Sequence, residues 1–568
     1  MNNYSSIQDV TDALSYAISH YAANSKTLFQ ELKSIHEGAR NSNTPIVYPN
    51  SVTGNPNKKI QLTLLSETET IVPIKSPRQV DFNGWTIEIT VSNQWNINNT
   101  VQTPYLFVLG ENRESEELSV SGIRKSAIDA GCFTDISQLN SGTKLVFVKD
   151  STPWTFRNET PNSYWSGGVF STPWANWNEN ESKIRTDILL VKNGMAINRP
   201  IAPYDSMQST PVVTYMNANE DQAYFKNLTF NRSASCCKVI NLAFIGRLNN
   251  VIVQNIHVTT ASTNSLTNDA CLTMTKITNL TIQNYDINKT YSSVSNHGYG
   301  LSMNCIWNLI IKDSHATGPM WGVLGCNDLN YVRLENCSLN RFDIHCYGRD
   351  VTCINCLFQN DNYIANLPSS ASGSSSINNN YNRLSSFYGT LSYHNCTFNG
   401  FYPLLTDYTY NVYSDYDIFI ENCSMKIYLS ETAFLFRMGF WAAPLNHRQK
   451  HIRKCWPNVF IDGLTISLRT DITTVYMFSL IDRETQNPAH PEAAIKEPIY
   501  YTSYLHVKNL RIQDMSGVAI NNASLVEMNK SSTEIDYAQR VFRFVQGIEY
   551  EFTGSGVPRL VLTNADFA

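Results

Sequence analysis

Three short strands in the middle of the chain bring acidic, basic and aromatic side chains together. Residues 301–305, 322–326 and 342–346 align with apolar side chains at alternate positions, so the remaining positions should face outward. A carboxylate and an imidazole on one such face could act as a general acid and a general base. We therefore predict that Asp343 and His345 are catalytic. The predicted substrate-binding residues on this face and just upstream of it are His297, Tyr299, Trp321 and Arg341.

A second set of candidate residues comes from three later strands, which end in Arg437, Asp482 and Glu527. If these strands stack as aligned, Asp482 and Glu527 lie about 5 Å apart at the backbone, close to the carboxyl spacing of a retaining glycosidase. Two carboxylates at that distance would raise the pKa of one of them, as an acid catalyst needs. Arg437 would then bind substrate. The other interpretation is an ordinary charge ladder on the outer face, neutralised by Arg437 and Arg483.

Four of the ten tryptophans lie between residues 154 and 177, among Asn, Ser, Gly and Pro. Flat apolar rings can stack on the C–H faces of sugars, so Trp165, Trp174 and Trp177 are candidate substrate-binding residues. A subunit interface or a local core would also concentrate tryptophan. The sequence leaves both interpretations open.

One pattern repeats from about residue 224, in which two apolar residues at alternate positions are followed by Asn or Asp. The alternation predicts a strand with one buried face, and the polar residue marks a turn, where Asn tolerates left-handed backbone. From residue 227 to residue 355, successive turn residues are 19 to 29 residues apart, the length of one solenoid coil. We expect stacked coils with an amide ladder along one corner, formed by Asn227, Asn255, Asn284, Asp313, Asn336, Asn355, Asn395 and Asn422.

Cysteine supports the same repeat, because four cysteines directly follow turn asparagines. We predict that they stack inside the solenoid, and they are Cys337, Cys356, Cys396 and Cys423. The 13 cysteines of the chain lack CxxC spacing and fall mostly in apolar runs, so free buried thiols are expected rather than disulfides or zinc ligands. We expect no metal and no cofactor.

The composition is typical of a large folded protein. With 568 residues, 42% of them hydrophobic and 16% charged, the chain can bury a long interior but exceeds the size of one compact core. A formal net charge of −5 gives no general attraction to nucleic acid. No signal peptide pattern and no apolar stretch of membrane-spanning length is present. We expect synthesis in the cytoplasm and no membrane insertion.

The repeated corners resemble the pectin-lyase-like superfamily of right-handed β-helices, which includes many phage tailspikes. Residues 71–87 are similar to the first coil of that family, and the resemblance covers roughly residues 60–530. It implies an all-β, right-handed parallel β-helix solenoid with a short N-terminal helical segment. The implied division is 1–40 as an N-terminal helical attachment or cap, 41–220 as first coils with the Trp-rich insertion, 221–530 as the central parallel β-helix and 531–568 as a C-terminal cap.

By the same resemblance, the chain would be a tailspike or tail receptor-binding protein that binds bacterial surface polysaccharide and could depolymerise it, as a glycoside hydrolase or a lyase. It would be made in the host cytoplasm, join the virion as a homotrimer, and contact other tail proteins through its N-terminal segment. A non-catalytic structural virion fibre or adhesin is one alternative, and a bacterial polysaccharide lyase or hydrolase is another. The fold alone does not decide among them, because this superfamily includes lyases, hydrolases and binders.

Overall fold

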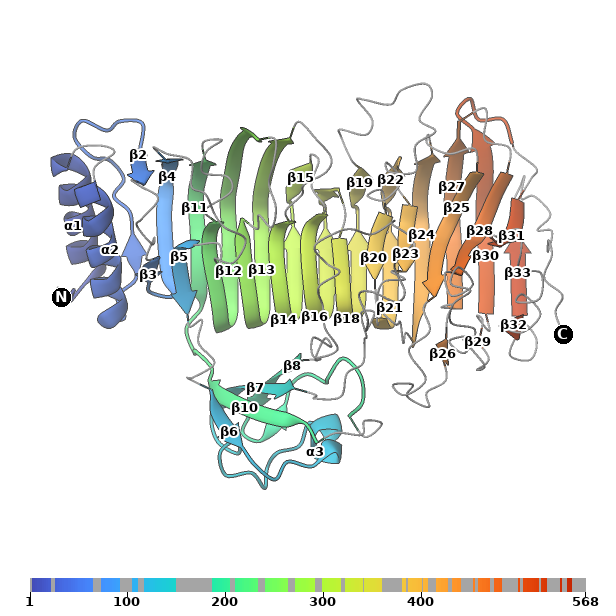
Figure 1. The fold of residues 1–568 in the computed structure, drawn as a ribbon, viewed down its shortest axis with the longest axis horizontal. Helices are drawn as coiled ribbons and strands as arrows, with labels where there is room; N and C mark the ends of the chain where they lie inside the picture. The colour runs from blue at the N-terminus through green and yellow to red at the C-terminus, as the bar shows by residue number, and fades with distance from the viewer. Residues whose placement is uncertain are drawn as a thin grey trace, which may run out of the picture.

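The chain folds into an elongated parallel β-solenoid that begins with two helices and carries a small antiparallel sheet on one side (Figure 1). The fold comes from a computed structural model. The structure describes residues 3–21, 26–64, 73–91, 105–110, 117–149, 186–204, 210–232, 241–263, 271–291, 299–317, 322–340, 342–359, 381–384, 387–400, 402–406, 415–427, 432–440, 453–454, 458–469, 474–482, 499–500, 504–519, 523–528, 542–543 and 549–553.

The strands of the solenoid pair in parallel, each with the matching strand of the next coil, and form one continuous sheet. They are β1 (Ile46–Val47), β2 (Lys59–Leu64), β3 (Ile74–Ser76), β4 (Gln79–Val91), β5 (Tyr105–Gly110), β11 (Ala223–Arg232), β12 (Asn241–Thr263), β13 (Leu272–Tyr291), β14 (Tyr299–Lys312), β15 (His315–Thr317), β16 (Gly322–Glu335), β17 (Ser338–Leu339), β18 (Phe342–Ile354), β19 (Leu357–Gln359), β20 (Tyr381–Leu384), β21 (Phe387–His394), β22 (Thr397–Asn399), β23 (Tyr402–Thr406), β24 (Asp415–Ile427), β25 (Thr432–Phe440), β27 (Asn458–Leu468), β28 (Thr474–Asp482), β30 (Tyr504–Asp514), β31 (Ala523–Met528) and β33 (Glu549–Thr553). A separate parallel sheet contains β26 (Arg453–Lys454), β29 (Ile499–Tyr500) and β32 (Phe542–Arg543).

Each coil turns at residues whose backbone is left-handed. In β12 these are Arg247, Asn250 and Asn255, with φ of 56°, 55° and 53°, and they divide the strand into four stretches. The next coil, β13, repeats all three corners 29 residues later. Left-handed backbone costs a residue with a Cβ about 1–2 kcal/mol, and Asn visits it more readily than most. The corners are therefore the positions where residue type is most restricted.

The Asn and Asp residues of the repeat form the expected ladder along one corner of the solenoid. The side chain of Asn255 donates to Asn227 Oδ1 at 2.7 Å, and that of Asn284 donates to Asn255 Oδ1 at 2.8 Å. The same bond joins Asn355 to Asn336 at 3.1 Å. Strands on both sides of the corner pair in register from coil to coil. The predicted stacking of coils is confirmed.

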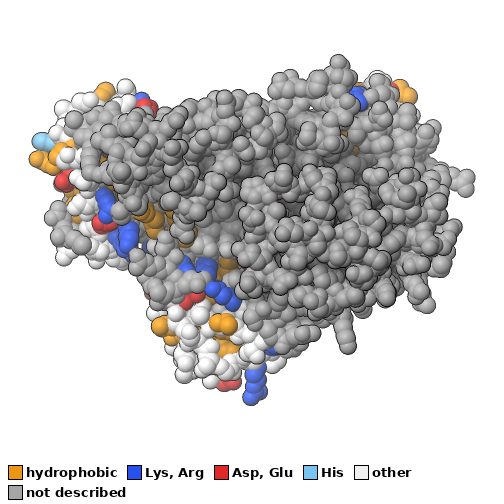
Figure 2. Space-filling view, viewed as in Figure 1, with side chains coloured by type: hydrophobic (Ala, Val, Ile, Leu, Met, Phe, Trp, Pro, Cys, Tyr) orange, Lys and Arg blue, Asp and Glu red, His pale blue; other side chains and the backbone are white. Residues whose placement is uncertain are grey.

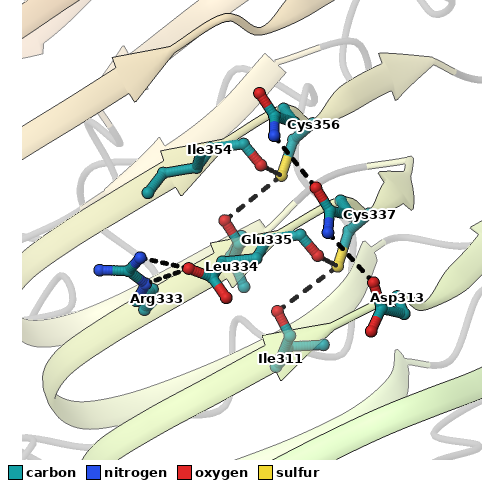
Figure 3. Close-up of polar contacts among 10 residues, drawn as sticks. Ile311, Asp313, Arg333, Leu334, Glu335, Cys337, Ile354 and Cys356 are labelled. Atoms are coloured by element: carbon teal, nitrogen blue, oxygen red, sulfur yellow. Dashed lines mark hydrogen bonds and ion pairs between the residues drawn. The ribbon is translucent and has the colours of Figure 1, made fainter.

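The cysteines that follow these asparagines lie in the core, as predicted. At most 4% of the surface is exposed in Cys337, Cys356, Cys396 and Cys423, and all are free thiols. Cys337 Sγ donates to the carbonyl of Glu335 at 3.1 Å, and Cys356 Sγ to that of Ile354 at 3.4 Å (Figure 3). The thiols thus satisfy their hydrogen bonds inside an apolar interior.

The N-terminal helices α1 (Ile7–His20) and α2 (Lys26–Asn41) pack against the first coil and share its core. Ser6 and Asp9 form a capping box that fixes the start of α1. His36 of α2 is fully buried, with Nδ1 2.8 Å from Ser76 Oγ and Nε2 3.0 Å from Tyr48 Oη. Burial lowers the pKa of His36 to about 3, so the ring stays neutral. The helices therefore cover backbone that an open first coil would expose.

An antiparallel sheet is inserted between β5 and β11, where the sequence predicted only first coils and a Trp-rich insertion. Its strands, in spatial order, are β6 (Leu118–Val120), β10 (Val212–Asn217), β7 (Thr143–Lys149), β8 (Thr186–Lys192) and β9 (Met195–Ala196). One apolar face includes Val146 and packs with Ile128 of the short helix α3 (Lys125–Ala130). The opposite face includes Phe147 and meets the solenoid. The inserted sheet projects from the solenoid as a lobe (Figure 2).

The ladder predicts a specific ranking of substitutions at Asn284, whose φ is 52°. Asn284→Ala should lower the free energy of unfolding by about 2–3 kcal/mol, because it loses the bond to Asn255 and because Ala tolerates left-handed backbone less well than Asn does. Asn284→Gly should cost about 1 kcal/mol, because Gly adopts that backbone freely. Denaturant unfolding followed by circular dichroism measures both. Equal losses for Ala and Gly would show that backbone geometry does not constrain this corner.

Candidate functional site

One outward corner of the solenoid is covered by the inserted sheet. We call it the docking corner, and it consists of Arg247, Lys276, Cys305, Asp328 and Tyr347, which have φ between 53° and 59°. None is more than 6% exposed. In five successive coils, each of these residues directly follows a strand residue that pairs with its equivalent in the next coil. No asparagine stands at this corner. Other side chains occupy the left-handed backbone instead, and several of them contact the inserted sheet.

A buried ion cluster joins the inserted sheet to this corner. Glu117, just before β6, lies 3.0 Å from Arg247 Nε and also pairs with Lys276 Nζ. The side chains of Glu117 and Arg247 are each 3% exposed. Thr214 Oγ1 donates to the second carboxylate oxygen at 2.7 Å, and Lys276 Nζ lies 4.6 Å from the ring centre of Phe147. Both carboxylate oxygens are thus engaged, as a buried ion requires.

The charge state of Glu117 follows from these contacts. Burial by itself would raise its pKa, but the hydrogen bonds from Lys276 and Thr214 and the charges of Lys276 and Arg247 outweigh burial and lower the pKa. A carboxyl whose pKa is lower in the folded state stabilises the fold above its ordinary pKa and loses that effect as the pH falls through the lowered value. Glu117 is therefore ionised at neutral pH. Ion pairs as well as apolar packing hold the inserted sheet against the docking corner.

The opposite polar corner is open to solvent and is the candidate functional site. We call it the corner strip, and all its members are half-buried or exposed. Its backbone register is continuous over successive coils from β11 onward, whereas β4 carries extra residues at this corner, between Asp81 and Trp85. The strip comprises the corner residues Asn227, Asn255, Asn284, Asp313, Asn336, Asn355, Asn395, Asn422 and Asn509, and the outward residues Asp81, Lys226, Gln254, Gln283, Lys312, Glu335, Ile354, His394, Glu421, Asp462 and Lys508.

Charges of both signs occur along the corner strip, and several of them are paired. Lys226 Nζ lies 3.4 Å from Asp81, and His394 Nδ1 lies 2.8 Å from Glu421 Oε2. Glu335 pairs with Arg333, which neighbours it on the same strand (Figure 3). Such exposed pairs contribute little to stability, but they cancel the local field. The strip is therefore polar without a strong potential of one sign.

Amides connect the strip between these pairs. Gln283 Nε2 donates to Asp313 Oδ2 at 3.3 Å, and Asn336 Nδ2 donates to Asp313 Oδ1 at 3.1 Å. Gln254 and Gln283 bond to each other at 3.4 Å. In the sequence, the asparagine repeat predicted turns, and the candidate catalytic and binding residues were placed on other strands. The sequence feature that indicates the strip is the polar residue that directly precedes most of the corner asparagines.

An aromatic stack lies on the same outer face, next to the strip. The rings of Phe419 and Phe460 are 4.9 Å apart and nearly parallel at 10°, and His506 follows at 5.5 Å. Because the rings stack on one another along the solenoid, their faces are occupied and their edges meet solvent. The stack therefore stabilises the pairing of β24, β27 and β30 rather than offering a flat platform.

The structure corrects the predicted outward position of Asp343. Its side chain is 0% exposed, so it does not lie on an open face. A register shift in the pairing of β16 with β18 falls beside it: Cys326 pairs with Ile344, but Asn327 pairs with Cys346, which leaves His345 as an extra residue. The sequence could not show this, because alternation alone predicts neither covering segments nor a bulge. The side chain of His345 lies outside the described parts of the structure.

The structure also corrects the alignment that placed Asp482 beside Glu527. In the observed register Ser479 pairs with both Arg437 and Glu527, whereas Asp482 pairs with Phe440. Asp482 is thus three residues along the strand from the partner of Glu527, which separates the two backbones by about 10 Å along the strand. The predicted alignment of these two positions is wrong.

The other predicted site residues cannot be placed with their side chains. Tyr299 and Arg437 lie on β14 and β25, but only their backbone is described. The remaining ones lie outside the described residues, and they are His297, Trp321, Arg341, Trp165, Trp174 and Trp177. Their roles stay predictions.

Within the described ranges, no three His, Cys, Asp or Glu side chains are arranged to hold a metal ion. None of the helices that the structure describes is long and apolar enough to cross a membrane.

The sequence matches no protein-family model and no curated protein. The structure is similar to solved phage tailspikes. The tailspike protein gp49 from Pseudomonas phage LKA1 is 12% identical with a TM-score of 0.44, over 94% of this chain and 79% of that one. Tailspike gp61 of Pseudomonas phage phi297 is 11% identical with a TM-score of 0.45, over 91% and 77%. The gp54 tailspike of Acinetobacter baumannii bacteriophage AP22, solved in complex with A. baumannii capsular saccharide, is 11% identical with a TM-score of 0.41, over 87% and 75%.

The docking corner generates a stability prediction for Glu117→Gln. The variant leaves Arg247 and Lys276 buried without their anion, so the unfolding free energy should fall by about 3–5 kcal/mol. Glu335→Gln, which breaks the exposed pair with Arg333, is the matched control and should cost less than about 1 kcal/mol. Denaturant unfolding at neutral pH gives both values. A loss for Glu117→Gln as small as that of the control would mean that the cluster does not hold the inserted sheet.

Proposed function

We propose that this chain is a phage tailspike, a right-handed parallel β-helix that binds bacterial surface polysaccharide along the corner strip. The observation that carries the proposal is the strip itself, a polar track that faces solvent and repeats once per coil. Stacked strands lie about 4.8 Å apart, which is close to the length of one sugar unit. A long polymer can therefore meet successive coils through similar contacts.

The proposal extends to assembly and location. The protein acts in the virion as a tail component and a homotrimer, and the helices within residues 1–40 attach it to other tail proteins or cap the solenoid. Tyr16, 56% exposed on α1 and stacked on His20, supports an attachment role, because an exposed aromatic residue at the end of a solenoid suits a protein contact.

Cleavage of the bound glycan is a second candidate function, and one observation favours it. Strand β18 carries a buried carboxylate, Asp343, two residues before the bulged His345. Bulges are frequent beside active sites, where they re-aim a side chain. Because Asp343 is itself fully buried, it would act by orienting the imidazole of His345 rather than by contacting the glycan. Asp482 and Glu527 no longer support cleavage as a pair.

The proposed function is tested by biolayer interferometry of the full chain against purified bacterial capsular and O-antigen polysaccharides. At least one should bind. Gln254→Ala combined with Gln283→Ala should weaken that binding by about tenfold, because two hydrogen-bonding groups are lost from the strip. Gln61→Ala is the matched control, since Gln61 is an outward glutamine on β2 that bonds to Glu88, away from the strip.

Absence of binding across the panel would contradict the proposed function. Equal weakening by the strip variant and by Gln61→Ala would contradict the assignment of the strip. New reducing ends or unsaturated products in the same incubations report cleavage, and Asp343→Asn should abolish them while binding persists.

A further inference from the structure

We infer that the corner strip selects an uncharged, hydroxyl-rich polysaccharide rather than an acidic one. The inference rests on the proposed function and adds the chemical class of the ligand. It is carried by the spare hydrogen-bonding capacity of the stacked amides and by the partial neutralisation of the cations along the strip.

The amide ladder leaves matched donors and acceptors unused. A carboxamide has two N–H donors and an oxygen that can accept two hydrogen bonds. Asn255 gives one donor to Asn227 and accepts one bond from Asn284. Asn336 likewise donates to Asp313 and accepts from Asn355. Asn227, Asn255 and Asn336 thus each use one donor and one acceptor site within the ladder, which leaves one donor and one acceptor site of each amide for a ligand.

A sugar hydroxyl is the natural complement of such a group. One hydroxyl donates one hydrogen bond and accepts up to two, so it can satisfy the free donor and the free acceptor of one amide or of two neighbours. Carboxylate and phosphate groups only accept hydrogen bonds, so they can use the free amide donors but not the remaining acceptor sites of the amide oxygens. The repeated Asn and Gln side chains thus favour neutral hydroxyls over anions.

The charges of the strip point the same way. It contains the cations Lys226, Lys312 and Lys508 and the anions Asp81, Asp313, Glu335, Glu421 and Asp462. Lys226 pairs with Asp81 and Glu335 pairs with Arg333, so the cations of the strip are fewer than its anions and are partly neutralised. Nothing along the described strip forms a cationic track of the kind that an anionic polymer requires. Binding should therefore depend little on salt.

The test measures affinity of the full chain by biolayer interferometry for purified polysaccharides grouped by charge, namely uncharged O-antigens, uronate-bearing capsules and phosphate-bearing teichoic acids. We expect binders in the uncharged group, with a Kd that changes by less than about twofold between roughly 0.05 and 0.5 M NaCl, because screening acts on charge. Binding confined to the acidic groups, with affinity falling about tenfold over that range, would overturn the inference and leave the proposed function standing. Binding to none of the groups would overturn both.

A matched pair of variants locates the contact. Asn355→Gly removes a strip amide while keeping its left-handed corner, whose φ is 53°. Asn279→Gly is the control, because Asn279 has φ of 57° and stands in a similar ladder between Asn249 and Asn308 on another corner. Asn355→Gly should weaken binding about fivefold, as expected for one lost hydrogen bond. Equal effects of the two variants on binding, at matched thermal stability, would overturn the role of the strip amides.

Discussion

One left-handed polar corner in each coil is the constraint on which the rest of the structure depends. The backbone must turn with positive φ at that point, and Asn meets the requirement while its amide bonds to the same residue of the next coil. The ladder holds neighbouring coils in register, and the register in turn directs alternate side chains inward. The stacked core and the open polar strip both follow from this single repeated residue.

The solenoid uses a second left-handed corner in a different way. There the corner positions hold Arg247 and Lys276 instead of Asn, and these cations reach the buried Glu117. The strain of placing long side chains in left-handed backbone is offset by an ion cluster and apolar packing against the inserted sheet. The docking corner is thus closed by protein, whereas the corner strip is polar and open to solvent. The corner strip is therefore available to a ligand.

The repeat predicted most of the fold and little of the site. Asn and Cys at a fixed phase identified the corners and the interior, because both residues are restricted there by geometry and burial. The register of β28 could not be predicted, because Val475 and Phe478 are apolar on opposite phases of the strand, so alternation does not select one alignment. The burial of Asp343 depends on which other segments cover that side of β18. The sequence of β18 alone does not predict those segments.

The central claim is that sugar lies on the corner strip, and a crystal structure of the full chain with a fragment of its bound polysaccharide tests this most directly. The account predicts sugar units following the solenoid axis over Gln254, Asn284 and Asn355, with hydroxyls on the amides and no carboxylate contacts to the strip. Sugar bound on another face, with the strip empty, would contradict the account.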